Sequence, residues 1–339
     1  MAVPALLWNV APGGTHVRCL LCPHACLLRE GASGRCRVRK NLGGALVSFS
    51  SDCIAAVNLD PVEKKPLYHF LPGTTTFSLG TPGCTMSCAF CQNHTLSQQC
   101  PSAQGEVAPL SASRIAAMVD SAVGQGAKSI AFTYNEPTVS IELVHAVAPR
   151  ASEAGLPSVL VSNAFFSRAA LDLARHLVRA ANFDLKSFSN GFYTQYCGAR
   201  LAPVLDTIVA AAGYGWWVEL TTLLIPGLND SDEELRRIAA FIRTHLGRDV
   251  PWHLSRFRPM YKMRDIPPTP VATLERARAI GIAEGLRFVY TGNVPGHDGE
   301  SSYCPDCGDM VIRRRGYRLA PPVGHACGRC GFALPGVWA

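Results

Sequence analysis

Three cysteines in one short loop are the residues of this sequence best suited to chemistry. Cys84, Cys88 and Cys91 stand at C-x3-C-x2-C spacing directly after the apolar run at 76–79. Three thiolates can hold three corners of a cubane iron–sulfur cluster, which leaves the fourth iron free to bind and activate another molecule. The alternative is a tetrahedral zinc site whose fourth ligand lies elsewhere in the chain. The spacing favours the open cluster.

Most of the fourteen cysteines fall into three groups, of which this loop is one. The N-terminal group comprises Cys19, Cys22, Cys26 and Cys36, and the C-terminal group comprises Cys304, Cys307, Cys327 and Cys330. This grouping indicates three metal centres rather than a disulfide scaffold. Cys53, Cys100 and Cys197 stand apart, and we interpret them as buried apolar residues.

The two outer groups differ in spacing. The N-terminal C-x2-C-x3-C-x9-C pattern suits zinc or a second iron–sulfur cluster, with His24 as a substitute ligand. The C-terminal pattern, two C-x2-C knuckles nineteen residues apart, predicts a zinc ribbon, with rubredoxin-like iron as the alternative. The chain therefore divides into a cysteine-rich lobe at 1–75, a central domain at 76–298 and a ribbon at 299–339.

Composition excludes several classes of protein. A hydrophobic content of 48% with 17% charged residues is typical of a folded globular protein. No apolar stretch approaches the ~18 residues of a membrane span, and the N-terminus lacks signal-peptide features, so we expect a cytoplasmic protein without a membrane partner. The net charge is +7, but its basic residues are scattered. We interpret the one run, Arg313 to Arg315, as a solvated face, which makes a nucleic-acid partner the minority reading.

The central domain alternates short apolar runs with helical periods. Strands are expected at 76–79, 129–134, 158–162, 183–186, 216–224, 252–257 and 287–290, and helices at 111–123, 168–179, 232–246 and 270–284. Strands that alternate with single helices predict βα units and a parallel sheet. Six or seven such units favour a partial (β/α) barrel over a doubly wound sheet, and no G-x-G-x-x-G follows any strand.

Polar residues recur where these strands end, which is the catalytic face of a parallel barrel. They are Asn135 and Glu136 after the second strand, Asn163 after the third, Asp184 and Lys186 on the fourth, and His253 on the sixth. Each also has an ordinary reading: Glu136 as a helix N-cap, Asn163 as a turn residue, Lys186 as a surface charge and His253 as a core histidine. Their recurrence at successive strand ends predicts one site.

These residues carry a resemblance. The three-cysteine loop, with Phe90 before its last cysteine, is similar to the cluster loop of the radical S-adenosylmethionine (SAM) superfamily. More closely, the chain resembles the radical SAM enzymes of the AmmeMemoRadiSam system, relatives of pyruvate formate-lyase activating enzyme. The matching stretches are 19–23, 60–73, 132–137, 184–188, 197–200, 221–230, 292–296 and 335–338.

The resemblance implies an α/β fold with a partial (β/α)6-type radical SAM barrel, a 4Fe–4S cluster on the three cysteines, and bound SAM. It implies that Glu136 holds the SAM ammonium and that Lys186 neutralises its carboxylate. Asn163 matches a ribose-side Asn-Gly motif, although Ala164 replaces the glycine and alanine disfavours positive φ.

The remaining implied roles complete the cofactor-binding set. Asp184 would help to bind a cation, although Val161 stands where the activating enzymes have a further cation-site aspartate. His253 would flank the methionine end of SAM, and Ile225 would pack against its adenine. Phe90 and Asn135 are assigned to the same set.

The implied activity is reductive cleavage of SAM to methionine and a 5′-deoxyadenosyl radical, which abstracts hydrogen from an unidentified protein or small molecule. A low-potential donor of the flavodoxin or ferredoxin type would supply the electron. Activation of a glycyl-radical protein is one version, and a reaction involving AMMECR1-like or MEMO-like proteins is another. The rival class is a non-catalytic metal or redox module, which has no need of the strand-end residues beside an open-iron loop.

Overall fold

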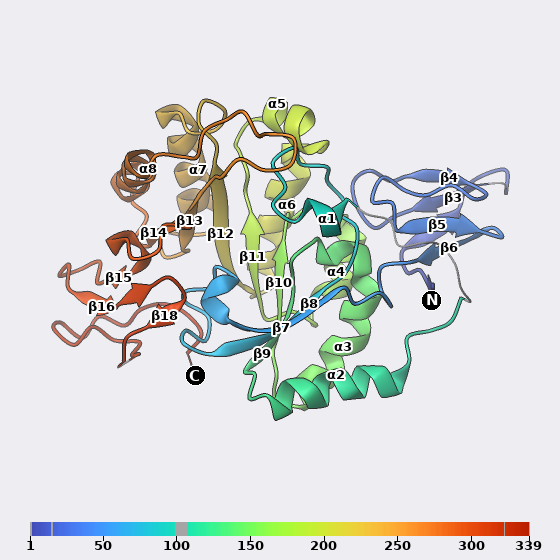
Figure 1. Ribbon diagram of the computed structural model, residues 1–339, viewed down its shortest axis with the longest axis horizontal. Helices are drawn as coiled ribbons and strands as arrows, with labels where there is room; N and C mark the ends of the chain where they lie inside the picture. Colours follow the sequence, from blue (N-terminus) through green and yellow to red (C-terminus); the bar gives the residue numbers. More distant parts are fainter. Residues whose placement is uncertain (1, 15, 99–106, 322, 339) are drawn as a thin grey trace.

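An eight-stranded sheet forms the centre of the protein (Figure 1). The computed structural model describes residues 2–14, 16–98, 107–321 and 323–338. The strands are β7 (Ala56–Pro61), β8 (Thr75–Gly80), β9 (Ser129–Phe132), β10 (Ser158–Ser162), β11 (Ala180–Asp184), β12 (Trp217–Leu224), β13 (Trp252–Arg256) and β14 (Val289–Gly292). They lie in sequence order, with β7 antiparallel to β8 and every later pair parallel. The predicted α/β fold, a partial (β/α) barrel on a parallel sheet, is confirmed.

Helices follow most of the parallel strands and pack on the sheet. They are α2 (Ala112–Gly124), α3 (Ile141–Glu153), α4 (Arg168–Ala174), α6 (Leu201–Gly213), α7 (Asp232–His245) and α8 (Val271–Ala283). The hydroxyls of Ser111, Ser167 and Ser231 cap α2, α4 and α7 by accepting the backbone N–H three residues on. Helices α3 and α6 were not predicted, because their alanine- and valine-rich sequences give no clear start signal.

Two differences in strand bounds affect the site. Strand β11 lies three residues before its predicted start, so Asp184 is its last residue and Lys186 belongs to the following loop. Strand β7, which the sequence placed in the lobe at 1–75, pairs with β8 and forms an edge of the central sheet. The division of the chain into three domains stays a prediction.

The N-terminal segment forms two small antiparallel sheets at one end of the molecule (Figure 1). One contains β1 (Val3–Pro4), β5 (Arg39–Leu42) and β6 (Ala45–Ser48), and the other contains β2 (Trp8–Val10), β3 (His16–Cys19) and β4 (Leu27–Arg29). The short helix α1 (His94–Ser97) lies beside this lobe in the view of Figure 1.

The C-terminal ribbon lies at the opposite end, next to β14 (Figure 1). Its strands are β15 (Ser302–Tyr303), β16 (Met310–Ile312), β17 (Arg314–Arg315) and β18 (Arg318–Leu319). Arg314 corrects our interpretation of the arginine run as a solvated face: its side chain is buried, and Nη2 donates to the carbonyl of Tyr68 at 2.8 Å. Its neighbours Arg313 and Arg315 are exposed.

A buried chain of hydrogen bonds joins the ribbon to the barrel. Arg314 Nη1 donates to Ser302 Oγ at 2.7 Å, and this hydroxyl lies 2.7 Å from Tyr290 OH. Tyr290 OH in turn lies 2.6 Å from Nε2 of His69, whose Nδ1 lies 2.6 Å from the carbonyl oxygen of Pro335. A carbonyl oxygen only accepts, so Nδ1 of His69 carries a proton, and because burial lowers the pKa of this imidazole to about 4, Nε2 is unprotonated at neutral pH and accepts from Tyr290. His69 is therefore held as a neutral imidazole.

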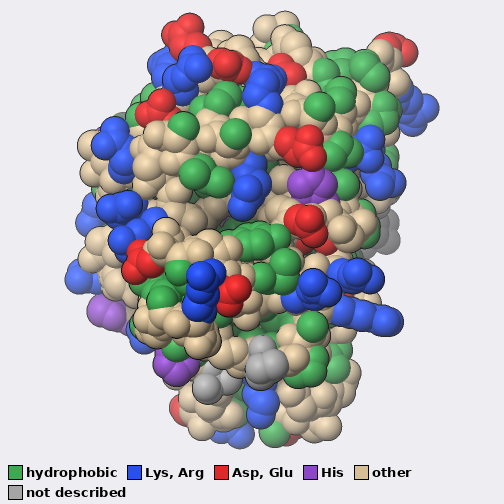
Figure 2. Space-filling view, turned by 90° about the vertical axis from the view of Figure 1, so that its left-hand side faces the viewer, with side chains coloured by type: hydrophobic (Ala, Val, Ile, Leu, Met, Phe, Trp, Pro, Cys, Tyr) green, Lys and Arg blue, Asp and Glu red, His purple; other side chains and the backbone are tan. Residues whose placement is uncertain are grey.

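Two observations bear on membrane and polyanion partners. None of the helices in the described ranges is long and apolar enough to cross a bilayer. On the face that carries α8 and the ribbon, Lys and Arg side chains are interspersed with Asp and Glu (Figure 2).

Candidate active site

The three-cysteine loop begins where β8 ends, and Asn135 from the end of β9 holds its first turn. The Asn135 amide donates to the carbonyl of Gly83 at 2.9 Å, and its Oδ1 accepts the Thr81 N–H at 3.2 Å. Gly83 has φ +93°, and a β-carbon there would lie 2.7 Å from Val38 of the N-terminal lobe. Asn135 thus supports the loop backbone, and glycine is required immediately before Cys84.

A second segment supports the loop around Cys88. The Ser87 N–H donates to the carbonyl of Cys197 at 2.9 Å, and the Ala89 N–H donates to Tyr196 at 2.8 Å. This segment is the π-helical turn Tyr193–Cys197, which follows the short helix α5 (Asn190–Phe192). Single π-helical turns often occur at functional sites.

Cys197 is a site residue that our sequence interpretation missed. Its thiol is fully buried and hydrogen bonded to Cys88, and this bond lowers the pKa of Cys88 although burial opposes the shift. Cys88 is therefore the thiol of the pair that ionises more readily, and Cys197 is the neutral donor. The only sequence signal for Cys197 was its position in the stretch at 197–200 that matches the family. Cys53 is half-buried, and Cys100 lies outside the described residues.

Lys186 places a mostly buried positive charge near Cys88. Its Nζ bonds Asp184 Oδ2 at 2.7 Å and lies 5.9 Å from the ring centre of Phe90. Burial works against this charge, but Asp184 and the thiols of Cys88 and Cys197 raise the pKa of Lys186 well above its usual value. Lys186 thus stays a cation next to a candidate cluster ligand, which suits an anionic thiolate centre.

Asn229 joins the Lys186 loop to the loop after β12. Its amide donates to the carbonyl of Lys186 at 2.6 Å, and its Oδ1 accepts the N–H of Ile225 at 2.7 Å. Ile225 is fully buried, directly after the last residue of β12. Asn229 lies in a matching stretch of the sequence but was not assigned to the site, because an asparagine in a Gly-Leu-Asn-Asp turn has an ordinary structural reading.

Glu136 lies at the other side of the loop, at the end of β9. Its Oε1 accepts from Thr138 N–H (3.0 Å), Thr138 hydroxyl (2.5 Å) and Ser162 hydroxyl (2.8 Å), while Oε2 accepts the Asn163 N–H at 2.8 Å. Burial raises the pKa of this carboxyl, and these donors oppose the rise. The N-cap reading is correct, since Glu136 caps the 3-10 turn Pro137–Ser140. It does not exclude binding, because each carboxylate oxygen has two lone pairs and Oε2 has one donor among the described residues.

Asn163 connects Glu136 to the cysteine loop. Its amide nitrogen lies 3.5 Å from Cys84 Sγ and donates to Thr85 Oγ1 at 3.1 Å, while Oδ1 accepts the Phe165 N–H at 3.0 Å. The following Ala164 is fully buried with φ +58°, so alanine adopts the left-handed conformation that the motif's glycine would take. The Asn-Ala departure is therefore accommodated in the backbone.

His253 contacts residues other than those around the cysteine loop. It is the second residue of β13, its Nε2 lies 2.7 Å from Glu219 Oε2, and its ring contacts Tyr68 and Tyr290 at centroid distances of 4.7 and 5.3 Å. Glu219 is fully buried and also accepts the N–H groups of Tyr68 and His69. This is the core reading of His253, and its assignment to the methionine end of SAM stays a prediction.

The cysteine loop has the donors that a cubane cluster needs. Burial, followed by the charge of Glu136, raises the pKa of Cys84 well above its usual value, so a thiolate there requires a bound cation. Cys88 already has a lowered pKa, and Lys186 supplies a compensating charge. Iron ions bound to this loop would supply the positive charge that a thiolate at Cys84 requires. The roles assigned to individual residues stay predictions.

The C-terminal cysteines form a metal site. The sulfurs of Cys304, Cys307, Cys327 and Cys330 all lie within 4.8 Å of one another. The knuckles are matched: Gly308 N–H donates to the carbonyl of Cys304, and Gly331 N–H to that of Cys327. Both glycines have positive φ, 75° and 78°. This is the geometry of four ligands on one tetrahedral ion.

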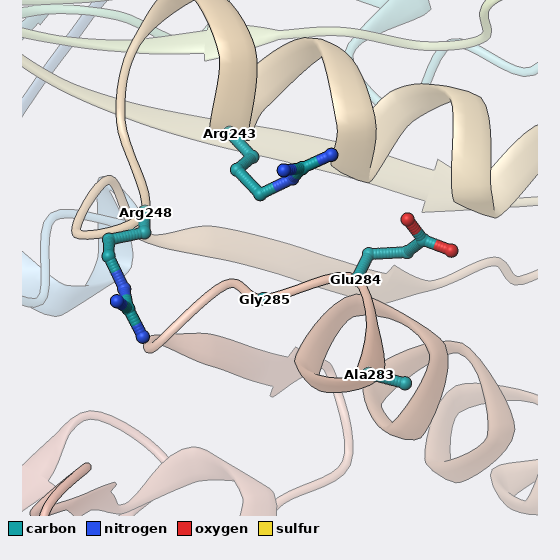
Figure 3. A pocket seen from close by; sticks show the side chains of 5 residues that line it. All are labelled: Arg243, Arg248, Ala283, Glu284 and Gly285. Atoms are coloured by element: carbon teal, nitrogen blue, oxygen red, sulfur yellow. The ribbon is translucent and has the colours of Figure 1, made fainter.

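A surface hollow at the opposite end of the sheet is not part of the site. Its lining residues are Arg243, Arg248, Ala283, Glu284 and Gly285, and Figure 3 shows Arg243 extending toward the side of Glu284 while Arg248 points away from it. These residues precede β13 and β14, whereas the cysteine loop and its partners follow the ends of their strands.

Comparison with known proteins identifies the class to which this fold and site belong. The sequence profile of the radical SAM superfamily matches residues 78–242, which include the cysteine loop, Glu136, Asn163 and Lys186. The chain belongs to the radical SAM superfamily and is a radical SAM enzyme. It is 42% identical over 298 residues to the uncharacterized protein MJ0808 of Methanocaldococcus jannaschii, covering 88% of this chain and 87% of that protein.

Solved structures similar to the chain include other radical SAM proteins. A domain of pyruvate-formate lyase-activating enzyme from Bacteroides vulgatus has a TM-score of 0.44 at 16% identity, covering 49% of this chain and 99% of that one. A radical SAM methyltransferase from Sphaerobacter thermophilus has a TM-score of 0.49 at 16% identity, covering 68% and 71%.

Proposed function

We propose that the chain cleaves SAM reductively at a 4Fe–4S cluster held by Cys84, Cys88 and Cys91, and that the resulting radical abstracts hydrogen from a substrate. The observation that carries the proposal is the position of Asn163, which bonds Glu136 through its backbone and reaches Cys84 through its side chain. A cluster on these thiolates would supply the electron that breaks SAM into methionine and a 5′-deoxyadenosyl radical.

In this proposal, different residues around the loop bind different groups of SAM. Glu136 Oε2 accepts a donor from the SAM ammonium, and Lys186 pairs with the SAM carboxylate. Ile225 supplies an apolar surface for adenine. Glu136 is buried and the side chain of Lys186 is only 12% exposed, so little water reaches these contacts, which strengthens them.

The substrate proposal rests on the resemblance. AMMECR1-like and MEMO-like proteins, which give the AmmeMemoRadiSam system its name, are the first partners to test. A glycyl-radical protein is the other candidate substrate, because of the likeness to activating enzymes.

We propose a low-potential flavodoxin or ferredoxin as electron donor. We propose zinc as the metal of the C-terminal ribbon, where sulfur pairs lie 3.4 and 3.5 Å apart.

Anaerobic reconstitution followed by a SAM cleavage assay tests the activity. The protein should be brown and should form 5′-deoxyadenosine under a low-potential reductant. Replacement of Cys84, Cys88 and Cys91 by alanine should abolish this product, whereas Cys53→Ala should retain it. Unchanged turnover in the triple variant would refute the proposal.

Deuterium transfer identifies the substrate. Deuterated candidate partners are incubated with enzyme and SAM, and 5′-deoxyadenosine is examined by mass spectrometry. The true substrate transfers deuterium to the 5′ carbon, and a partner that transfers none is excluded.

A further inference from the structure

A buried cation with unused hydrogen-bond donors lies near cysteine thiols of the N-terminal lobe. Arg39 is completely buried, and its charge acts on the thiols of Cys19 and Cys36. Its Nη2 bonds Glu142 at 3.0 Å and the carbonyl of Leu6, but Nε and Nη1 have no partner among the described residues. Buried donors without partners are rare in folded proteins. Two such donor nitrogens, on a cation whose charge acts on nearby thiols, indicate an anionic centre that would accept their N–H groups.

The spacing of these thiols differs from that of the ribbon. Within the described residues, the only group of three or more cysteines whose sulfurs all lie within 4.8 Å of one another is that of the ribbon. Thiolates on a single zinc ion cannot be further apart than about 4.6 Å, twice the Zn–S bond length. The N-terminal sulfurs are nevertheless neighbours, since a β-carbon at Gly34 would lie 3.7 Å from both Cys26 Sγ and Cys36 Sγ. Ligands of a cubane sit on different irons and are therefore further apart than the ligands of one zinc ion, which suits cysteines that are neighbours without forming a group as tight as that of the ribbon.

This centre contacts the three-cysteine loop directly. His24, between Cys22 and Cys26, has its Nε2 2.9 Å from the carbonyl oxygen of Thr85. The carbonyl of Cys36 lies 3.1 Å from the position of a β-carbon at Gly83. The N-terminal cysteines and the three-cysteine loop are thus joined by one hydrogen bond, from His24 to Thr85, and one packing contact, between Cys36 and Gly83.

We infer that Cys19, Cys22, Cys26 and Cys36 hold a second 4Fe–4S cluster, with Arg39 as its charge partner, that delivers electrons to the SAM cluster loop. This inference rests on the proposed function of that loop. A low-potential iron–sulfur or flavin protein gives one electron to the second cluster. The second cluster is reoxidised when this electron passes to the first, and no bond or proton changes at either step.

Metal analysis of the Cys84, Cys88 and Cys91 triple alanine variant tests the second cluster without depending on SAM cleavage. The variant should retain about four irons per chain with the Mössbauer signal of a 4Fe–4S cluster. Further replacement of Cys22 and Cys36 by alanine should remove this iron. Retention of zinc in place of iron at the N-terminal cysteines would overturn the inference.

Redox measurements test the role of Arg39 and the contact between centres. In the triple variant, Arg39→Gln should lower the midpoint potential of the second cluster, and Arg39→Lys should restore most of the shift, because a nearby positive charge stabilises the reduced cluster. In the reduced wild type, the EPR spectrum should show spin coupling between two clusters. A spectrum equal to the sum of the separate clusters, or a second cluster that cannot be reduced, would refute electron delivery.

The outcomes separate the two proposals. A second cluster in the triple variant, together with no SAM cleavage by the wild type, would refute the proposed function alone. SAM cleavage together with zinc in the N-terminal lobe would refute this inference alone.

Discussion

The backbone N–H of Asn163 donates to Glu136 Oε2 at 2.8 Å, and so joins the ends of two adjacent strands, β9 and β10. The side chain of the same asparagine reaches Cys84 Sγ at 3.5 Å. One residue thus fixes the distance between a buried carboxylate and a cluster ligand. A molecule that binds iron through one end and the carboxylate through an ammonium group would be positioned by this relationship.

Glu136→Gln should weaken SAM binding by ~10- to 100-fold. The substitution removes the charge but keeps the size, and a hydrogen bond to a charged group contributes about 1.5–3 kcal/mol. Anaerobic equilibrium dialysis with labelled SAM measures the change. Iron content should stay at the wild-type value, and Glu153→Gln, an exposed glutamate on α3, is the matched control. Wild-type affinity in Glu136→Gln would contradict the assigned role.

Cys197→Ala should lower the midpoint potential of the SAM cluster. The hydrogen bond that Cys197 donates to Cys88 stabilises the more negative, reduced cluster. If this bond is ~1 kcal/mol stronger in the reduced state, the shift is about 40 mV for one electron. Redox titration by EPR measures it. Cys197→Ser keeps a donor and should recover much of the potential, whereas equal potentials in all three proteins would show that Cys197 only fills space.

Gly198→Ala should destabilise the segment that supports the cluster loop. Gly198 has φ +65°, and a β-carbon there would lie 2.6 Å from Ser87 Oγ. The left-handed conformation alone costs about 1–2 kcal/mol for alanine. Gly213→Ala is the matched control, because its β-carbon meets nothing within 4 Å at the end of α6, and it should stabilise by about 0.5–1 kcal/mol. Thermal unfolding compares the two, and equal melting temperatures would count against the expectation.

Folding stability should fall as the pH drops from about 6.5 to about 4, through His69. Burial lowers the pKa of this imidazole to about 4, so the unfolded chain binds a proton in this range while the folded chain does not. The contribution is thus fully present above pH 6.5, and its loss amounts to about 3 kcal/mol. Urea unfolding at several pH values measures it. His69→Gln should show a flatter pH dependence, and a slope equal to that of the wild type would mean that another group is responsible.

The sequence alone was sufficient to predict features that depend on interactions between residues close together in the chain. Cysteine spacing predicted the cluster loop and the ribbon knuckles, because a metal site on a short loop needs ligands at fixed separations. The caps at Ser111, Ser167 and Ser231 were also readable, since an N-cap involves only the next three residues. Alternating apolar runs and helical periods gave the parallel sheet, and therefore the strand ends at which Glu136, Asn163 and Lys186 would lie.

Only the tertiary structure could decide which residues meet across the chain. Cys197 is more than a hundred residues from Cys88, and no spacing rule relates them. The contacts of His253 with Glu219, Tyr68 and Tyr290 also join residues that are far apart in the chain. The sequence predicted that Arg314 lies on a charged surface, but in the structure its side chain is buried and donates a hydrogen bond to the carbonyl of Tyr68. The contact between His24 and Thr85 likewise comes from the packing of the lobe on the barrel, which sequence periodicity does not specify.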